Sequence, residues 1–320
     1  MSYKGKRVLV IGGSGFVGKH LLRELSAQNP AVLQVSKLPE ESWNCEEFPD
    51  VEAVDLNILS DEDVHRCISE SRPDYLFHLA AQSSVGVSFQ KPKLTFEINL
   101  IGTLSVLESV RSICPGCRIL FIGTAEQYGI VDPSDLPIRE DFPISPVSPY
   151  AVSKMAAEAL AMAYWKNYGI QTIMVRSFNN IGPGQAPGFV VSSFSRQVAL
   201  IENGSQEAVM KVGNLAAERD FTDVRDIVRC YRILMIKGAA GEIYNVGSGC
   251  FYSVQYILDT LLSLSEKDIR IQIDPEKMRP LDIPRVQADI GKVKQNTGWI
   301  PEIPIEISLK DTLAYWRLNV

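Results

Sequence analysis

Residues 7–18 read RVLVIGGSGFVG, an apolar run that passes through a glycine-rich turn into an apolar segment of helical period. A strand buried on both faces of a parallel sheet is a continuous apolar run of this kind. Glycine lets the turn bend sharply, lets a pyrophosphate approach the backbone, and lets the helix pack on the strand. The free N–H groups at the start of the helix attract phosphate. The stretch therefore predicts a strand, a turn and a helix that bind a dinucleotide through Gly12, Gly15, Phe16, Val17 and Gly18.

The same alternation of apolar runs and helical segments continues over the first two-thirds of the chain. Near-continuous apolar strands separated by helices imply a parallel sheet that is covered on both faces. We therefore predict a doubly wound, Rossmann-like α/β fold. The expected strands are 7–11, 31–35, 75–79, 119–122 and 172–175, and the expected helices are 16–27, 61–71, 93–113 and 150–168.

After Arg176 the pattern changes. The next residues include NNIGPGQAPG, which is too rich in glycine and proline for anything but a loop. We expect 1–178 to form the dinucleotide-binding domain, with 213–247 returning to it. A smaller C-terminal α/β lobe, built from 179–212 and 248–320, is expected to bind the substrate. The elements expected after the loop are helices near 189–203 and 224–237 and strands near 208–212, 242–246 and 269–273.

The composition and net charge of the sequence limit the class of protein. Of 320 residues, 46% are hydrophobic and 22% charged, as in an ordinary soluble domain. The formal net charge of -6 argues against nucleic acid or an acidic membrane as the main partner. No signal peptide is visible, and no apolar run approaches the ~20 residues of a membrane helix, so we expect a cytoplasmic protein. Cys114-Pro-Gly-Cys117 is better explained by a turn between a helix and a strand than by a redox or metal site, and we predict no metal.

The end of the second expected strand decides between NAD and NADP, because an acidic residue there binds the ribose 2′-hydroxyl and repels a 2′-phosphate. No carboxylate follows this strand before Glu40, whereas Ser36 and Lys37 can donate hydrogen bonds to a 2′-phosphate. NADP(H) is therefore the predicted cofactor. Asp55, after the next strand, can accept a hydrogen bond from the adenine amino group. The other positions expected to contact the cofactor are Leu56, Leu79, Ala80, Ala81 and Asn99.

Tyr150 and Lys154 begin the helix expected at 150–168 and share one helical face. A lysine ammonium group beside a tyrosine stabilises the phenolate, so we expect the pKa of Tyr150 to be lowered toward the working pH. Tyr150 can then exchange the proton that accompanies hydride transfer at a carbinol carbon. Thr124 ends the neighbouring strand and can hydrogen-bond the same substrate oxygen.

The segments GGSGFVG (12–18), HLAA (78–81), GTAEQYG (123–129) and SPYAVSK (148–154) together resemble the extended short-chain dehydrogenase/reductase superfamily. Four downstream segments resemble its branch that acts on GDP-linked 6-deoxy-hexoses: RSFNNIGPGQ (176–185), 211–228, YNVGSG (244–249) and MRPLDIP (278–284). The resemblance implies that Thr124, Tyr150 and Lys154 are catalytic and that Tyr150 and Lys154 also contact the cofactor. It implies a homodimer through the helices at 93–113 and 150–168. The substrate contacts that it implies are Asn179, Val190, Lys211, Arg219 and Arg279.

The triplet Thr124-Ala125-Glu126 separates two activities of this branch. A 4,6-dehydratase needs a base for the C5 proton and an acid for the C6 hydroxyl. In sugar-nucleotide dehydratases the corresponding triplet resembles Thr-Asp-Glu or Thr-Ser-Glu. Glu126 is a candidate catalytic base, but Ala125 offers only a methyl group, which cannot donate a proton. The segments GPGQ and RDFTDVRD also resemble the reductases more than the dehydratases.

We therefore expect NADPH-dependent reduction of the C4 ketone of GDP-4-keto-6-deoxy-D-mannose to GDP-D-rhamnose, with Tyr150 as the proton donor. Three alternatives remain open. The first is a GDP-mannose 4,6-dehydratase that uses Glu126 as its base, and the second is another nucleotide-sugar epimerase or dehydratase of the same superfamily. The third is a non-catalytic NADP-binding sensor, which the presence of both Tyr150 and Lys154 disfavours.

Overall fold

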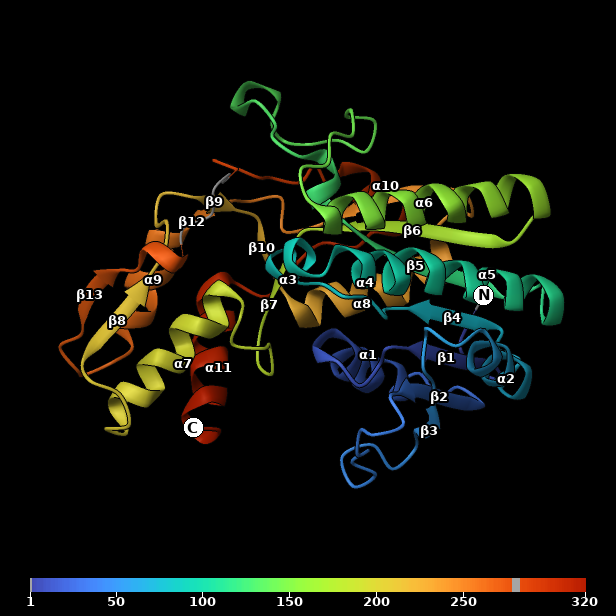
Figure 1. Ribbon diagram of the computed structural model, residues 1–320, viewed down its shortest axis with the longest axis horizontal. Helices are drawn as coiled ribbons and strands as arrows, with labels where there is room; N and C mark the ends of the chain where they lie inside the picture. Colours follow the sequence, from blue (N-terminus) through green and yellow to red (C-terminus); the bar gives the residue numbers. More distant parts are fainter. Residues whose placement is uncertain (1, 278–282) are drawn as a thin grey trace.

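A computed structural model describes residues 2–277 and 283–320 (Figure 1). Its centre is a seven-stranded sheet in the order β11-β6-β5-β4-β1-β2-β3, in which every neighbouring pair is parallel. The chain starts in the middle of the sheet, winds outward through β2 and β3, and returns to wind the other way from β4. This arrangement confirms the predicted doubly wound α/β fold. The strands are β1 (Arg7–Ile11), β2 (Val32–Lys37), β3 (Glu52–Asp55), β4 (Tyr75–His78), β5 (Arg118–Thr124), β6 (Gln171–Ser177) and β11 (Ile243–Val246).

Helices cover both faces of the sheet. Val8 and Val10 of β1 pack in one core with α1 (Phe16–Ser26) and α8 (Val224–Lys237). Leu9 and Ile11 of the same strand pack in a second core on the other face. Because successive side chains of a strand point to opposite faces, burial of both sets gives the continuous apolar run seen in the sequence. The helices on the second face are α2 (Asp61–Ser71), α5 (Gly102–Ile113) and α6 (Pro149–Tyr168).

The helix expected at 93–113 is divided in the structure. It begins as α4 (Pro92–Phe96), passes through a π-helical turn η1 (Glu97–Ile101), and continues as α5. A short helix α3 (Val85–Gln90) precedes it. π-Helical turns occur frequently at functional sites, and this one contains Asn99. The segment 114–117 is the turn between α5 and β5 that the sequence predicted, with the Cys117 N–H donating to the Cys114 carbonyl at 2.8 Å.

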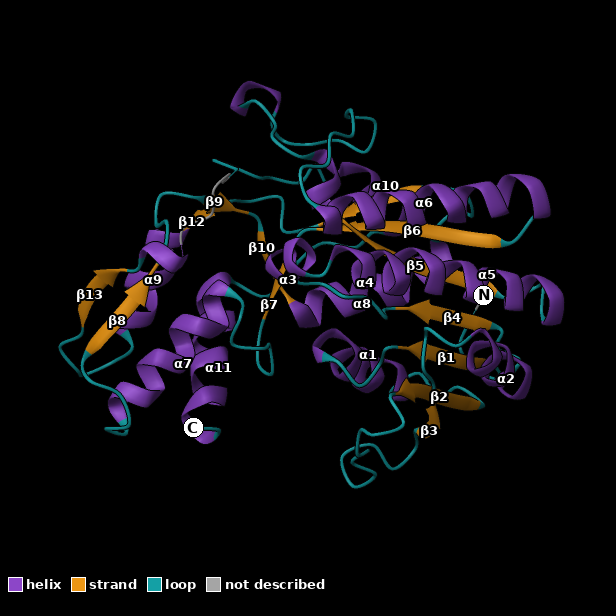
Figure 2. Ribbon diagram, in the orientation of Figure 1, coloured by secondary structure: helices purple, strands orange, loops and turns teal. Residues whose placement is uncertain are grey.

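The C-terminal part of the chain builds a separate core away from the main sheet (Figure 2). Three helices surround it: α7 (Val190–Glu202), α9 (Val254–Ser263) and α11 (Ile305–Leu318). A two-stranded parallel sheet joins β8 (Val209–Val212) to β13 (Arg270–Ile273). The smaller elements are β7 (Asn179–Ile181), β9 (Glu218–Arg219), β10 (Phe221–Asp223), β12 (Tyr252–Ser253), α10 (Gly291–Thr297), η2 (Ala125–Tyr128), η3 (Pro133–Asp135) and η4 (Pro275–Lys277).

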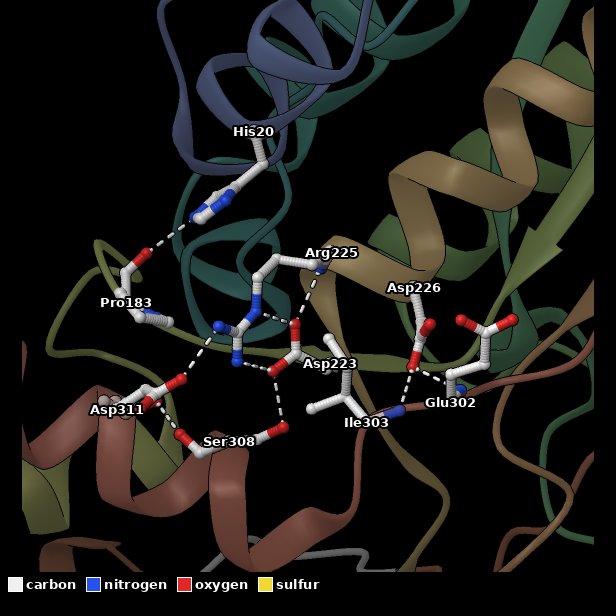
Figure 3. A network of polar contacts seen from close by, with 10 residues as sticks. His20, Pro183, Asp223, Arg225, Asp226, Glu302, Ile303, Ser308 and Asp311 are labelled. Atoms are coloured by element: carbon white, nitrogen blue, oxygen red, sulfur yellow. Dashed lines mark hydrogen bonds and ion pairs between the residues drawn. The ribbon is translucent and has the colours of Figure 1, made fainter.

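The start of α8 fastens the C-terminal helix α11 to the sheet domain (Figure 3). Asp223 caps α8, since its carboxylate accepts the Arg225 N–H at 2.8 Å, and it also pairs with the Arg225 guanidinium. The Ser308 hydroxyl of α11 donates to Asp223 at 2.5 Å, and Asp311 of α11 pairs with Arg225 at 2.8 Å. Two carboxylates of α11 and β10 thus share one guanidinium at the joint between the two parts.

A second contact at this joint involves His20 of α1. Its Nε2 lies 2.9 Å from the carbonyl oxygen of Pro183, in the glycine- and proline-rich loop (Figure 3). Because a carbonyl only accepts, His20 donates this hydrogen bond. Burial lowers the pKa of His20, which favours the neutral ring. The helix that follows the glycine-rich turn is therefore tied to the loop that leads into the C-terminal part. Among the described residues, no helix is long and apolar enough to span a membrane.

Candidate active site

The glycine-rich turn after β1 is built so that no side chain fills it. Gly12 has a φ of +79°, and a Cβ there would lie 2.6 Å from the backbone of Ala80. A Cβ on Gly18 would collide with the backbone of Gly13. At Gly15, by contrast, a Cβ would make only an ordinary contact, 3.6 Å from the Gly12 oxygen, so no protein atom crowds this residue. Gly15 is the N-cap of α1 and has no side-chain hydrogen bond to the first turn. This open helix start fits a dinucleotide pyrophosphate.

Ser36 and Lys37 lie at the end of β2, as the sequence predicted. The Ser36 hydroxyl oxygen accepts the Gly12 N–H at 2.9 Å, so this side chain supports the glycine turn from behind. Lys37 forms an ion pair of 2.5 Å with Asp55, at the end of β3. If Lys37 binds a 2′-phosphate, its ammonium group would therefore contact both the phosphate and the Asp55 carboxylate. Leu56, the next residue, is buried in the core beside α2.

The segment after β4 crosses the sheet close to the glycine turn. The N–H groups of Leu79 and Ala80 donate to the Ile11 carbonyl at 2.9 and 3.0 Å, and Ala81 follows them. Asn99 holds Gln82, the residue after Ala81, because the Asn99 amide oxygen accepts the Gln82 N–H at 2.8 Å. The Asn99 amide nitrogen donates to Ser153 of α6 at 2.9 Å. Asn99 thus joins this segment to the helix that carries Tyr150 and Lys154.

Thr124 and Tyr150 come together at the carboxyl end of the sheet. Thr124 is the last residue of β5, and its hydroxyl oxygen accepts the Glu126 N–H at 3.3 Å. Tyr150 is the second residue of α6, after the N-cap Ser148 and Pro149. Both side chains are buried, and the Thr124 hydroxyl lies near enough to the Tyr150 phenol to lower its pKa as a hydrogen-bond partner.

The pKa of Tyr150 is raised to about 12, so the expectation of a lowered value was wrong. Burial of the phenol is the largest cause, because it disfavours the phenolate. The hydrogen bond with Thr124 acts in the opposite direction, and the nearby Glu126 carboxylate adds to the rise. Tyr150 is therefore a protonated phenol at neutral pH, which is the state of a proton donor.

Lys154 is buried one helical turn after Tyr150, and its ammonium group lies 4.7 Å from the centre of the Phe121 ring. Burial lowers the pKa of Lys154 to about 8, and the Glu158 carboxylate opposes this shift. The neighbouring His78 is neutral, because burial and the charge of Lys154 lower its pKa to about 3. Lys154 therefore carries its charge at neutral pH and loses it slightly above.

Ala125 and Glu126 form the first turn of η2. Ala125 packs against an apolar cluster that includes Tyr128 and Phe142. The methyl group thus faces hydrophobic side chains, where a dehydratase would need a proton donor. Glu126 is half-buried and close enough to Tyr150 for its charge to raise the pKa of that residue.

The predicted substrate contacts lie on several elements of the C-terminal part. Asn179 is exposed at the start of β7, and Val190 is the first residue of α7 and packs on its core. Lys211 of β8 is exposed, with backbone hydrogen bonds to the Gln197 side chain. Arg219 donates to the Ile283 carbonyl at 2.6 Å. Arg279 lies outside the described residues.

Sequence reasoning missed a group of buried polar residues in η2 and in the elements packed beneath it. They are Gln127, Tyr128, Glu158, Arg176 and Asn245. One signal was available: Arg176 is a charged residue that directly follows the apolar run 173–175 of its strand. Its partner Glu158, on a helix, could not be identified from spacing alone.

Comparison with known proteins gives the family of the chain. Residues 9–312 match the family described as GDP-mannose 4,6 dehydratase. The chain is 35% identical to GDP-6-deoxy-D-mannose reductase of Pseudomonas aeruginosa, over 98% of each protein. It is 28% identical to a GDP-mannose 4,6-dehydratase of Vibrio cholerae, over 94% of this chain and 91% of that one.

Solved structures give the same result. The structure of RMD from Pseudomonas aeruginosa in complex with NADPH aligns with a TM-score of 0.86 and 34% identity, over 98% of this chain and all of that one. A UDP-glucose 4-epimerase from Thermotoga maritima, with UDP-glucose, aligns with a TM-score of 0.86 and 28% identity, over 98% and 99% of the two chains. Fold and sequence together define an extended short-chain dehydrogenase/reductase. Within that superfamily, the chain belongs to the GDP-mannose 4,6-dehydratase family.

Proposed function

We propose that this protein reduces the C4 ketone of GDP-4-keto-6-deoxy-D-mannose to GDP-D-rhamnose with NADPH. The observation that carries the proposal is the identity of 35% with a GDP-6-deoxy-D-mannose reductase over nearly the whole of both chains. The site supports the same direction of chemistry, because Tyr150 is a protonated phenol beside the Thr124 hydroxyl. Ala125, with no proton to donate, makes dehydration harder than reduction.

NADP(H) is the proposed cofactor, and a relative of known structure binds NADPH. The open start of α1 at Gly15 would hold the pyrophosphate, with Ser36 and Lys37 near the adenosine end. Bound NADPH supplies the hydride. Tyr150 would donate its proton to the C4 oxygen, and Thr124 would hydrogen-bond that oxygen as charge develops on it. The Lys154 ammonium group would stabilise the phenolate that Tyr150 becomes after donation.

The proposed substrate contacts are in the C-terminal part of the chain. The pyrophosphate of a sugar nucleotide suits Lys and Arg donors, and Lys211 and Arg219 are proposed for that role. Asn179 would contact the sugar or the phosphates, and Val190 would line the same region. Arg279 completes the proposed set but lies outside the described residues. The division into a cofactor domain (1–178 and 213–247) and a substrate lobe is proposed on the same basis.

A second candidate function is GDP-mannose 4,6-dehydration, with Glu126 as the base. Two observations favour dehydration: the Glu126 carboxylate is close to Tyr150, and the relatives of this chain include dehydratases. Consumption of cofactor distinguishes the two, since a dehydratase returns the hydride within each turnover and a reductase does not.

The test follows NADPH absorbance with purified protein and either GDP-4-keto-6-deoxy-D-mannose or GDP-mannose. We expect stoichiometric oxidation of NADPH with the ketone and none with GDP-mannose. Conversion of GDP-mannose to a 4-keto product without net loss of NADPH would contradict the proposal and establish the dehydratase.

A homodimer in the cytoplasm is proposed as the working state. Exposed apolar side chains lie on the α3–α6 side of the sheet domain: Phe89 at 62%, Ile101 at 50% and Tyr168 at 56%. Burial of such residues against a second copy would stabilise a dimer. Light scattering after size-exclusion chromatography tests this, with a mass of one chain as the contrary result.

A further inference from the structure

A buried ion pair lies directly beneath the proposed catalytic residues. Arg176 of β6 donates to both oxygens of Glu158 of α6, at 2.6 Å from Nη2 and 3.0 Å from Nε. The two side chains are only 3% and 6% exposed. Transfer of two charges out of water costs several kcal/mol per ion, and apolar residues of the same volume often stabilise a fold as well or better. Stability alone therefore explains this pair poorly.

The pair connects the two segments that carry the proposed catalytic groups. Glu158 follows Lys154 by one turn of α6, and it also accepts a hydrogen bond of 3.3 Å from Gln127. Arg176 donates to the Tyr128 hydroxyl at 2.9 Å, and its guanidinium lies 4.9 Å from the Tyr128 ring. Gln127 and Tyr128 are the last two residues of η2, the turn that begins after Thr124 and contains Glu126.

The surroundings leave the pair little freedom to move. A Cβ at Gly123 of β5 would lie 3.0 Å from the Gln127 amide nitrogen and 2.7 Å from the Val175 carbonyl. The Tyr128 hydroxyl donates to Asn245 of β11 at 2.7 Å, and Asn245 in turn donates to the Ile138 carbonyl at 2.9 Å. A continuous set of hydrogen bonds thus runs from α6 through β6 to η2 and β11.

The same pair sets the charge around Lys154. The groups near Lys154 are the Phe121 ring from β5, His78 from β4, and Glu158 from its own helix. Of these, Glu158 is the carboxylate whose charge raises the pKa of Lys154 against the effect of burial. Arg176 lies behind Glu158 and donates to both of its carboxylate oxygens.

We propose that Glu158 and Arg176 are positioning residues of the reduction: their ion pair, through its hydrogen bonds to Gln127 and Tyr128, holds the turn 124–128 at a fixed distance from α6. The inference rests on the proposed function. The geometric effect of the pair is on the position of the turn 124–128, and its electrostatic effect is on the pKa of Lys154. Different substitutions separate the two effects.

The test begins with Glu158→Gln, which keeps the shape of the side chain and removes its charge. We expect kcat to fall by about 10- to 100-fold, as for a small misplacement of catalytic groups, with KM for both substrates within about threefold. The upper pH limit of kcat should move to lower pH, because Lys154 loses its proton earlier without the carboxylate. An NMR titration of 13C-labelled lysine side chains should show the same lowered pKa for Lys154, independently of any turnover.

Glu158→Asp separates the two effects, since it keeps the charge but shortens the side chain. We expect the titration of Lys154 to return toward that of the wild type while kcat stays low. If Glu158→Gln does not fold because Arg176 is left unpaired, the double variant E158Q/R176M removes both charges and takes its place. The matched control is Arg118→Met, which removes a buried arginine from the opposite end of β5 and should alter neither kcat nor the Lys154 titration.

A folded Glu158→Gln protein with wild-type kcat, or with an unchanged Lys154 titration, would overturn the proposal. Failure of the wild-type protein to oxidise NADPH with the ketone would instead refute the proposed function. The two failures are distinct, because the lysine titration needs no substrate.

Discussion

Two turns at the carboxyl end of one sheet are held in opposite ways. The turn after β1 is held by the lack of side chains: Gly12 and Gly18 let backbone pack on backbone, and a single hydroxyl from Ser36 supports them. The turn after β5 is held by buried polar side chains, with Gln127 and Tyr128 anchored to a charged pair. The first turn leaves space for the proposed cofactor, and the second fixes the turn that carries the proposed catalytic groups.

The difference reflects what each turn has to do. A pyrophosphate is bound by N–H groups and a helix dipole, so the protein needs close approach and little else. Proton transfer needs hydroxyl and ammonium groups within a fraction of an ångström of their proper places. Side chains reach that precision only when other side chains hold them. Substitutions in the two turns should therefore fail differently.

Gly12→Val should have the largest effect. The new side chain would overlap the backbone of Ala80. Valine is also β-branched, and it would have to adopt a φ of +79°. Strain and overpacking of this kind cost about 1–3 kcal/mol each. We expect the affinity for NADPH, measured by fluorescence titration, to fall by more than about 100-fold. Gly116→Ala is the control, because a Cβ there meets no atom within 4 Å; equal losses in both variants would contradict the argument.

Tyr150→Phe should abolish catalysis and leave the fold and the glycine turn intact. Loss of general acid catalysis reduces kcat by about 10²- to 10⁴-fold. Because the pKa of Tyr150 is raised to about 12, the phenol is protonated over the whole working range, and its hydroxyl is the group removed. Affinity for NADPH should be close to that of the wild type. Tyr168→Phe, at the exposed end of the same helix, should have no effect; retention of activity in Tyr150→Phe would exclude it as the proton donor.

The same contrast explains what the sequence could predict. The glycine turn was predictable because its signal is local: strand, glycines and helix follow one another within twelve residues. Tyr150 and Lys154 were predicted for the same reason, as neighbours on one helical face. The doubly wound sheet was predicted from repetition of the first motif, without long-range information, and the observed strand order confirms it.

The support of the second turn was not predictable in this way. Glu158 and Arg176 are 18 positions apart and on different elements, and only the crossing of α6 over β6 brings them together. The pKa of Tyr150 was predicted in the wrong direction because spacing shows Lys154 and not the degree of burial. The π-helical turn at Asn99 was not predicted either, because the spacing of apolar residues across it cannot be told from that of an ordinary α-helix.

Lys154→Met should stabilise the protein while it removes activity. Burial lowers the pKa of Lys154 to about 8, from an ordinary value of about 10.5. The unfolded chain therefore binds the proton more tightly, and burial of the charged group lowers stability below pH 8. The deficit shrinks as the pH rises from 8 toward 10.5, where both states are neutral. We expect the variant to gain on the order of 3 kcal/mol at pH 7 and little at pH 10.5, by urea denaturation. Lys166→Met, near the exposed end of α6, is the matched control, because it removes a lysine of the same helix that is not buried.

Glu126→Gln should have the smallest effect and would decide what the carboxylate in the second turn does. Removal of its charge lowers the pKa of Tyr150 from about 12, yet the phenol remains protonated at neutral pH, so its capacity to donate is kept. We expect kcat for ketone reduction to stay within about threefold of the wild type, because no step of the reduction uses Glu126 as acid or base. Ala125→Ser is the companion variant, as it restores a hydroxyl beside Glu126 without a charge. A loss of more than about 100-fold in Glu126→Gln would make Glu126 a working acid or base. If the wild-type protein also forms a 4-keto product from GDP-mannose, such a loss would mean that the turn after β5 is held rigid for proton abstraction from carbon. Reduction would then be the lesser of the protein's two reactions.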